Sequence, residues 1–248
     1  MIRRMQYRCS FKLLGNDVPL DNIIERGREK FEKLIRDGRV CNASFYRYEN
    51  MGFLYVEEIS DEETDRGDEG ENSRKEIGTD GKRHFEDSFP GIDSIMSDLN
   101  PYLKPWPREN GDVYFAPMIN VYYHHIPEDD LDAWEHERTT DKKQRIGRIA
   151  FVFPEKLPSY VMYHNAIVEE GLLKGDKYAF ISMHENLLFS YYEEPRNNVN
   201  IKDSEEESKV INDWLSVDPE SHFDREKAQG SNFLVIPCLF TVDRVDFS

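Results

Sequence analysis

The pattern of hydrophobic and polar positions divides the chain into two halves with the same order of predicted elements. In the first half, alternation predicts a strand over residues 5–13, and apolar residues at helical spacing predict a helix over 23–35 that ends at Asp37-Gly38. The remaining predicted elements of this half are strands over 43–47 and 53–58, a helix over 92–103 and a strand over 113–123. The order is therefore strand, helix, strand, strand, helix, strand.

The second half repeats this order. Its first strand is predicted over 148–153, followed by a helix over 157–173 that stops at Lys174-Gly175. The later elements are a hairpin of strands over 177–183 and 187–194, a helix over 205–215 and a closing strand over 233–247. The order βαββαβ is that of the ferredoxin-like split βαβ unit, and here it occurs twice.

Weak similarity between the halves supports a repeat. Residues 52–58 align with 188–194, and residues 116–119 align with 236–239. We therefore predict an α+β protein with tandem ferredoxin-like repeats, in which two sheets form one intrachain, dimeric-type α/β barrel. Two similar but independent α+β domains are the alternative. The predicted first repeat covers residues 1–125, and the second covers 146–248.

Two segments interrupt the predicted repeats. Residues 57–71 are acidic with almost no apolar side chains, which predicts a loop within an insertion over about 57–90 of the first repeat. Residues 126–145 are predicted to connect the halves. His124, His125 and His136 suggest a metal site together with Glu135 and Glu137, but we favour a polar connecting helix over residues 128–138 and expect no metal.

The charge and the cysteines argue against several classes of partner and site. The 248-residue chain has 49 acidic and 32 basic residues and a net charge of −17, which argues against nucleic acid and anionic membranes as partners. Three widely spaced cysteines, Cys9, Cys41 and Cys238, predict neither a disulfide framework nor a zinc cluster. Since no apolar stretch is long enough to cross a membrane, we expect a cytoplasmic protein.

The helix over residues 157–173 carries the candidate chemistry. Tyr160 and His164 lie four residues apart, so they share a helix face that should be buried, and a phenol beside an imidazole is a candidate proton-transfer pair. Aligning the predicted helix ends at Gly38 and Gly175 sets Ile23 opposite Tyr160 and Gly27 opposite His164. This asymmetry predicts one working pocket, in the second half. A hydrogen-bonded core histidine is the alternative.

The same helix resembles that of the L-rhamnose mutarotases, whose pattern is Tyr-x-x-x-His-Asn-x-Ile-x-x-Glu. The matching positions are Tyr160, His164, Asn165, Ile167 and Glu170. In the following hairpin, Tyr178-Ala179 and Asn186-Leu187-Leu188-Phe189 also match. The resemblance covers about residues 149–247, whereas the first repeat shares only the order of elements.

The resemblance implies an isomerase that interconverts the anomers of a monosaccharide by general acid–base catalysis, without a cofactor or a metal. It implies His164 as the proton-transfer residue, with Tyr160 orienting it or donating a proton. The candidate substrate-binding residues are Asn165, Glu170, Tyr178 and Trp214. It also implies a monomer with a pseudo-dimeric barrel or a homodimer. The alternatives are a non-catalytic binding or regulatory module and a haem-binding barrel enzyme.

Overall fold

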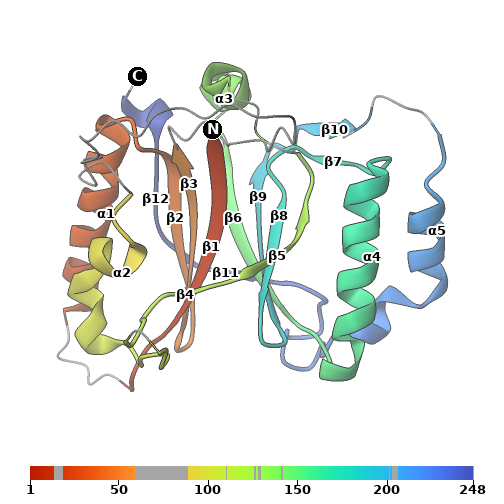
Figure 1. Cartoon of the computed structure of the whole chain (residues 1–248), viewed down its shortest axis with the longest axis horizontal. Helices are drawn as coiled ribbons and strands as arrows, with labels where there is room; N and C mark the ends of the chain where they lie inside the picture. Colours follow the sequence, from red (N-terminus) through yellow and green to blue (C-terminus); the bar gives the residue numbers. More distant parts are fainter. Residues whose placement is uncertain are drawn as a thin grey trace, which may run out of the picture.

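The structure is a computed structural model of the whole chain. It describes residues 1–13, 19–59, 89–109, 111–125, 127, 130–140, 142–200, 202 and 206–247. Two antiparallel sheets of five strands stand face to face, with helices on their outer sides and helix α3 (Leu131–Thr140) across one end (Figure 1). The protein is therefore α+β, as predicted.

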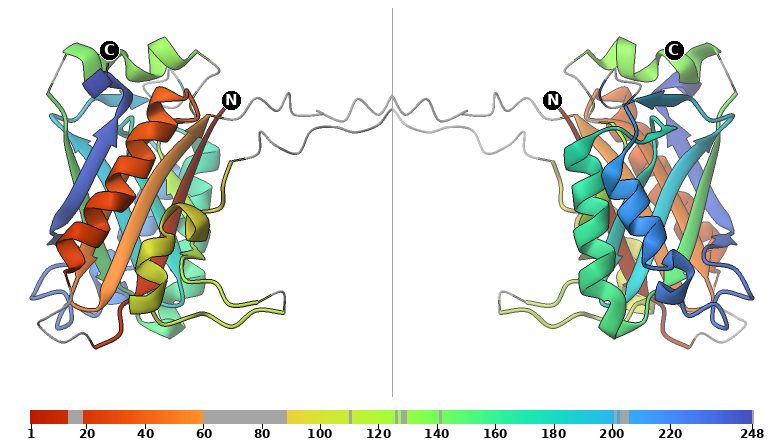
Figure 2. Two further views of the ribbon diagram at one scale, coloured as in Figure 1. Left: turned by 90° about the vertical axis from the view of Figure 1, so that its left-hand side faces the viewer. Right: turned by 90° about the vertical axis from the view of Figure 1, so that its right-hand side faces the viewer.

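The first sheet comes mainly from the N-terminal half. Its strand order is β12-β2-β3-β1-β4. The strands are β1 (Ile2–Ser10), β2 (Val40–Tyr48), β3 (Met51–Ile59), β4 (Ala116–Pro117) and β12 (Cys238–Asp243). Helix α1 (Leu20–Arg36), the short α2 (Ile92–Ile95) and the 3₁₀ turn η2 (Ser97–Tyr102) cover its outer face (Figure 2). The predicted helix over 92–103 is thus two short helical pieces.

The second sheet comes mainly from the C-terminal half and has the order β11-β6-β9-β8-β5. Its strands are β5 (Ile119–Tyr123), β6 (Gln144–Phe151), β8 (Phe180–His184), β9 (Leu187–Glu194) and β11 (Leu234–Ile236). Helices α4 (Leu157–Glu170) and α5 (Lys209–Ser216) pack on its outer face (Figure 2). The short turns are η3 (Pro154–Lys156), η4 (Pro219–His222) and η5 (Arg244–Phe247), and β7 (Lys174–Asp176) pairs with β10 (Asn198–Asn200) in a separate ribbon.

Two long predicted strands are each divided between the sheets. Within the strand predicted over 113–123, β4 pairs with β1 in the first sheet and β5 pairs with β8 in the second. Within the strand predicted over 233–247, β11 pairs with β6 and β12 with β2. Pro117 and Pro237 lie at these switches, and proline has no N–H to give to a strand ladder. The single-strand predictions are therefore wrong.

Aromatic side chains fill the space between the sheets. The rings of Phe53 and Phe189 stack with their centroids 5.1 Å apart, and those of Tyr55 and Tyr191 stack at 3.7 Å. These are equivalent positions in the predicted alignment of residues 52–58 with 188–194, so the alignment identifies strands that face each other. Gly147 allows a close approach of the two sheets, because a Cβ there would lie 2.6 Å from the Tyr46 ring.

The ends of α1 and α4 correct the predicted alignment of the two helices. Gly38 and Gly171 both have a φ of 70°, the left-handed conformation that ends many helices. Helix α4 therefore stops at Gly171, whereas Gly175 lies in β7. With Gly38 matched to Gly171, Phe31 falls opposite His164. The predicted pairing of His164 with Gly27 is wrong, although the chemical asymmetry between the two helices remains.

Other boundaries shift less. The predicted acidic loop begins too early, because residues 57–59 belong to β3; residues 60–88 of the insertion lie outside the described residues. The connecting segment does contain a helix, α3, and the strand predicted over 177–183 is β8, starting at Phe180. Within the described part of the chain, no helix is long and apolar enough to span a membrane.

Candidate active site

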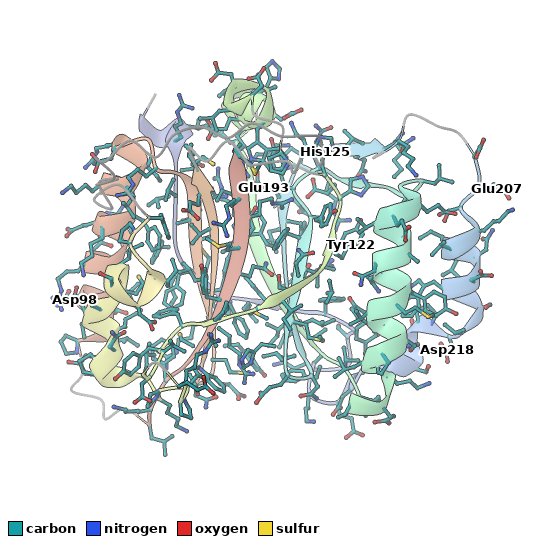
Figure 3. The ribbon with its side chains drawn as sticks, viewed as in Figure 1. Asp98, Tyr122, His125, Glu193, Glu207 and Asp218 are labelled. Carbon is teal, nitrogen blue, oxygen red and sulfur yellow. The ribbon has the colours of Figure 1, made fainter. Side chains whose placement is uncertain are left out.

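Three of the predicted site residues come together on the outer side of the second sheet. The rings of Tyr160 and His164 stack with centroids 3.8 Å apart, and the indole of Trp214, from α5, meets the imidazole edge-on at 5.2 Å. Tyr122, on β5, forms a further wall at 6.1 Å and is labelled in Figure 3. The helix spacing therefore correctly predicted that Tyr160 and His164 share one face, and Trp214 packs against them.

The chemistry of this cluster suits packing better than proton transfer. His164 Nδ1 lies 2.8 Å from the Tyr160 carbonyl oxygen, a backbone contact within the helix. Burial among the aromatic rings lowers the pKa of His164 from 6.5 to about 4, so the imidazole is neutral near pH 7. Burial also raises the pKa of the Tyr160 phenol, whose oxygen has no hydrogen-bond partner among the described residues. An acid–base group works best with a pKa near the operating pH.

The other predicted binding residues lie apart from this cluster. Asn165 is exposed and lines a shallow cleft of about 360 Å³ between α4 and β5. Glu170 accepts hydrogen bonds from Ser208 Oγ and, at 3.1 Å, from the Lys209 backbone N–H, so it fixes the start of α5. Tyr178 lies in the core between the sheets, where its hydroxyl donates to the Trp134 carbonyl oxygen at 2.8 Å. The expectation of one site that includes Tyr178 is therefore wrong, because β8 and β9 separate the two groups.

A buried ionic cluster joins α3 to both sheets. The Arg138 side chain is completely buried and donates to Glu57 on β3 at 2.8 Å and to Glu193 on β9 at 2.6–3.1 Å. Figure 3 shows Glu193 beneath α3, between the sheets. Tyr55 and Tyr191 donate to Glu57 and Glu193 at 2.6 Å each. Because each carboxylate has several donors, this cluster fixes the position of α3.

Helix α3, which lies in the predicted polar connector, also carries a buried carboxyl group. Asp130 caps the helix by accepting a hydrogen bond from the Ala133 N–H at 3.0 Å. The side chains of Trp134 and Arg138 lie on the buried face of the helix. Glu135 follows Trp134 and is only 5% exposed. Its Oε1 atom is buried and has no hydrogen-bond partner among the described residues.

The carboxyl of Glu135 lines a cleft of about 260 Å³ between α3 and η5, which we call the α3–η5 cleft. Its lining residues are Asp132, Glu135, His136, Thr139, Arg244 and Val245. Arg244 NH1 lies 3.6 Å from Glu135 Oε2 and has no hydrogen-bond partner in the described part of the chain. The cleft thus joins a guanidinium to a carboxyl group whose hydrogen bonds are incomplete.

Burial sets the acidity of Glu135. It raises the pKa of this carboxyl from 4.5 to about 7, against the lowering influence of Arg138 and Arg244; Glu57 and Asp132 add smaller raising contributions. A carboxyl group with this pKa is present in both protonation states near neutral pH, which is what a general acid–base group needs. The sequence alone could not predict this pKa, because it depends on contacts with η5, which lies more than a hundred residues away along the chain.

The described residues contain no group of three His, Cys, Asp or Glu side chains that could hold a metal ion. In particular, His124 and His136 have separate surroundings. His124 is buried and contacts the Tyr122 hydroxyl at 3.0 Å, whereas His136 lines the α3–η5 cleft.

Comparison with known proteins gives a distant likeness. No protein-family model matches the sequence, and no curated protein matches it. A putative monooxygenase from Fusobacterium nucleatum subsp. nucleatum is 10% identical with a TM-score of 0.39, over 98% of this chain and 94% of that chain. A putative monooxygenase from Lactobacillus acidophilus is 5% identical with a TM-score of 0.40, over 97% and 96%. These values carry no conclusion about activity, and the mutarotase resemblance gains no support from them.

Proposed function

We propose that the protein is a general acid–base enzyme that moves a proton on a small polar molecule in the α3–η5 cleft, with Glu135 as the proton-transfer group. One observation carries the proposal: a carboxyl group lining a cleft has an unpartnered oxygen and a pKa of about 7. Strongly perturbed pKa values in a cleft are typical of functional sites.

The neighbours of Glu135 have complementary roles in this proposal. Arg244 would hold a carbonyl or ring oxygen of the substrate and stabilise the negative charge that develops there when a proton leaves. The NH1 atom of Arg244 supports that role, because it has no hydrogen-bond partner among the described residues and lies 3.6 Å from the Glu135 carboxyl group. Asp132, His136 and Thr139 would bind hydroxyl groups at the rim.

The size of the cleft limits the substrate. At about 260 Å³ it falls below the usual range for drug-sized ligands, roughly 300–1,000 Å³, so a monosaccharide or a molecule of similar size is the expected occupant. The proposal retains isomerisation of a monosaccharide by acid–base catalysis, the reaction class implied by the sequence resemblance. It places proton transfer at Glu135, and the roles of Tyr160 and His164 as the catalytic pair stay a competing prediction.

Proton NMR saturation transfer between sugar anomers tests the proposal, using a panel of deoxyhexoses, aldohexoses and uronates. We expect the intact protein to accelerate exchange for at least one sugar, and Glu135→Gln to remove about 10²-fold or more of that acceleration. His164→Ala and Glu155→Gln, an exposed carboxylate at the base of α4, should retain it.

The variants separate the competing explanations. Loss of exchange in His164→Ala, with Glu135→Gln unaffected, would move the reaction to the Tyr160 cluster. No acceleration by the intact protein on any sugar would reject mutarotation and favour the non-catalytic binding module. Circular dichroism of each variant distinguishes a lost reaction from a lost fold.

We also propose that the two halves are tandem ferredoxin-like repeats that close one barrel. Three observations support this: each half contributes its strands in the same order, each final strand switches sheets at a proline, and equivalent residues stack across the centre. The filled interior favours a catalytic cleft outside the barrel, at α3, over one inside it.

A further inference from the structure

A second polar cluster lies at the end of the sheets opposite α3. Arg8 near the end of β1 and His184 at the end of β8 face the space between the sheets, and Arg8 NH1 lies 3.2 Å from His184 Nδ1. The indole of Trp106, from the segment after η2, meets the His184 ring edge-on at 4.8 Å. The Arg8 guanidinium carbon lies 5.5 Å from the indole centroid. Segments far apart in the sequence thus bring three polar side chains together.

This cluster contains buried donors without acceptors. Arg8 Nε and Trp106 Nε1 are both buried, and neither has a hydrogen-bond partner among the residues that the structure describes. Ser182 Oγ is also buried without a hydrogen-bond partner among the described residues, and Ser182 is 1% exposed. A buried donor that has lost water and gained no acceptor is unfavourable, so such groups in a folded protein indicate a missing acceptor.

The strand pattern places Ser182 beside the other donors. Gln6 reaches the Phe180 carbonyl oxygen at 3.4 Å, and Arg8, two residues on, reaches His184. Ser182 lies between Phe180 and His184 on β8, and alternate residues of a strand share one face. The hydroxyl of Ser182 therefore points to the same side as the Phe180 and His184 side chains.

We propose that Arg8, Trp106 and Ser182 bind the carboxylate group of a small molecule at this end of the sheets. A carboxylate presents two oxygens with about four acceptor positions, which suits an arginine Nε–H, an indole N–H and a serine hydroxyl. This site lies at the opposite end of the molecule from the α3–η5 cleft and does not depend on the function proposed for Glu135.

The charges at the cluster favour a carboxylate over a phosphate. Arg8 is 13% exposed at its side chain, and its NH1 already donates to Glu185 at 2.7 Å. The positive charge available to a ligand is therefore reduced, which disfavours a dianion with three or more acceptor oxygens. A monoanion with two oxygens needs less compensation.

Acetate and inorganic phosphate are the probes, added to ¹⁵N-labelled protein at matched ionic strength with sodium chloride as the reference. The three indole N–H signals report directly, and Trp106→Phe identifies the one that belongs to Trp106. We expect acetate to shift that signal with saturation and to raise the pKa of His184, which burial and then Arg8 hold below 6.5. The apparent Kd for phosphate, read from the same signal, should be at least tenfold higher than that for acetate.

Matched arginine variants test the donor assignment. Arg8→Lys keeps the charge and removes the Nε–H, so the apparent Kd for acetate should rise about tenfold or more. Arg148→Lys is the control, because Arg148 Nε on β6 donates to Ser190 at 3.1 Å and is already satisfied. The two other indole signals, unchanged in every variant, show that the fold is intact.

Three results would overturn the proposal. No saturable shift of the Trp106 signal up to molar acetate would mean that water alone occupies the donors. Equal or tighter binding of phosphate would reject the carboxylate class. Equal effects of Arg8→Lys and Arg148→Lys would reject the donor set.

Discussion

Replacing Arg138 with methionine should destabilise the protein strongly. The Arg138 side chain is completely buried and pairs with Glu57 and Glu193, which are also completely buried. Without the guanidinium, two carboxylates remain in the core without the cation that pairs with both of them. Breaking a buried ion pair in this way costs about 3–5 kcal/mol, whereas breaking the exposed pair of Arg225 and Glu220 should cost less than about 1 kcal/mol.

The pKa of Glu57 gives an independent magnitude and a sign. Burial alone would raise this pKa, but the charge and hydrogen bonds of Arg138 lower it from 4.5 to about 2. At about 1.4 kcal/mol for each tenfold change, the difference corresponds to about 3 kcal/mol of stability. Because the folded pKa is the lower one, this stability is present above pH 4.5 and is lost as the pH falls towards 2.

Chemical denaturation with urea from pH 7 to pH 2 measures these effects. The intact protein should lose stability on acidification, whereas Arg138→Met should start about 3–5 kcal/mol lower at pH 7 and recover part of it as its unpaired carboxylates are protonated. The triple variant Arg138→Met, Glu57→Gln, Glu193→Gln removes the charges together and should be more stable at pH 7 than the single variant. The charge reasoning would be refuted if Arg138→Met cost no more than Arg225→Met.

Two further predictions concern the cores on either side of the second sheet. Gly147→Ala should destabilise the protein by about 1–3 kcal/mol in the same urea assay, because its Cβ would lie 2.6 Å from the Tyr46 ring. Gly91→Ala is the matched reference, because nothing lies within 4 Å of a Cβ there, and equal losses in the two variants would contradict the steric reason. In ¹H–¹³C NMR spectra the His164 imidazole should titrate with a pKa of about 4, and a value near 6.5 would contradict the packed aromatic cluster. Because the folded pKa is the lower one, the stability contributed by the neutral imidazole is fully present above pH 6.5 and is lost as the pH falls through 4.

Much of the fold follows from local patterns in the sequence. The period of apolar residues predicted α1 and α4, because each helix buries one face. Short runs of strand-forming residues on either side of a turn predicted the hairpins of β2 with β3 and of β8 with β9, whose strands are largely buried on both faces. The division of the fourth strand of each half between two sheets could not be predicted from periodicity, since each pair of segments reads as one run of strand. The prolines at 117 and 237 were the available signal.

The candidate site could be predicted only in part. Helical spacing placed Tyr160 and His164 together correctly, but it gave no information on the rings that surround them or on the resulting pKa of about 4. Glu135 looked like one more charge in a polar helix. Its burial depends on contacts of α3 with both sheets and on Arg244, which is far away in the sequence.

Titration of the Glu135 carboxyl group by ¹³C NMR is the most direct test of the proposed site. We predict a pKa of about 7, with the side-chain signal assigned by its absence in Glu135→Gln. A pKa near 4.5 would contradict the proposal, because Glu135 would then be an ordinary ionised carboxylate at neutral pH and unable to donate a proton there.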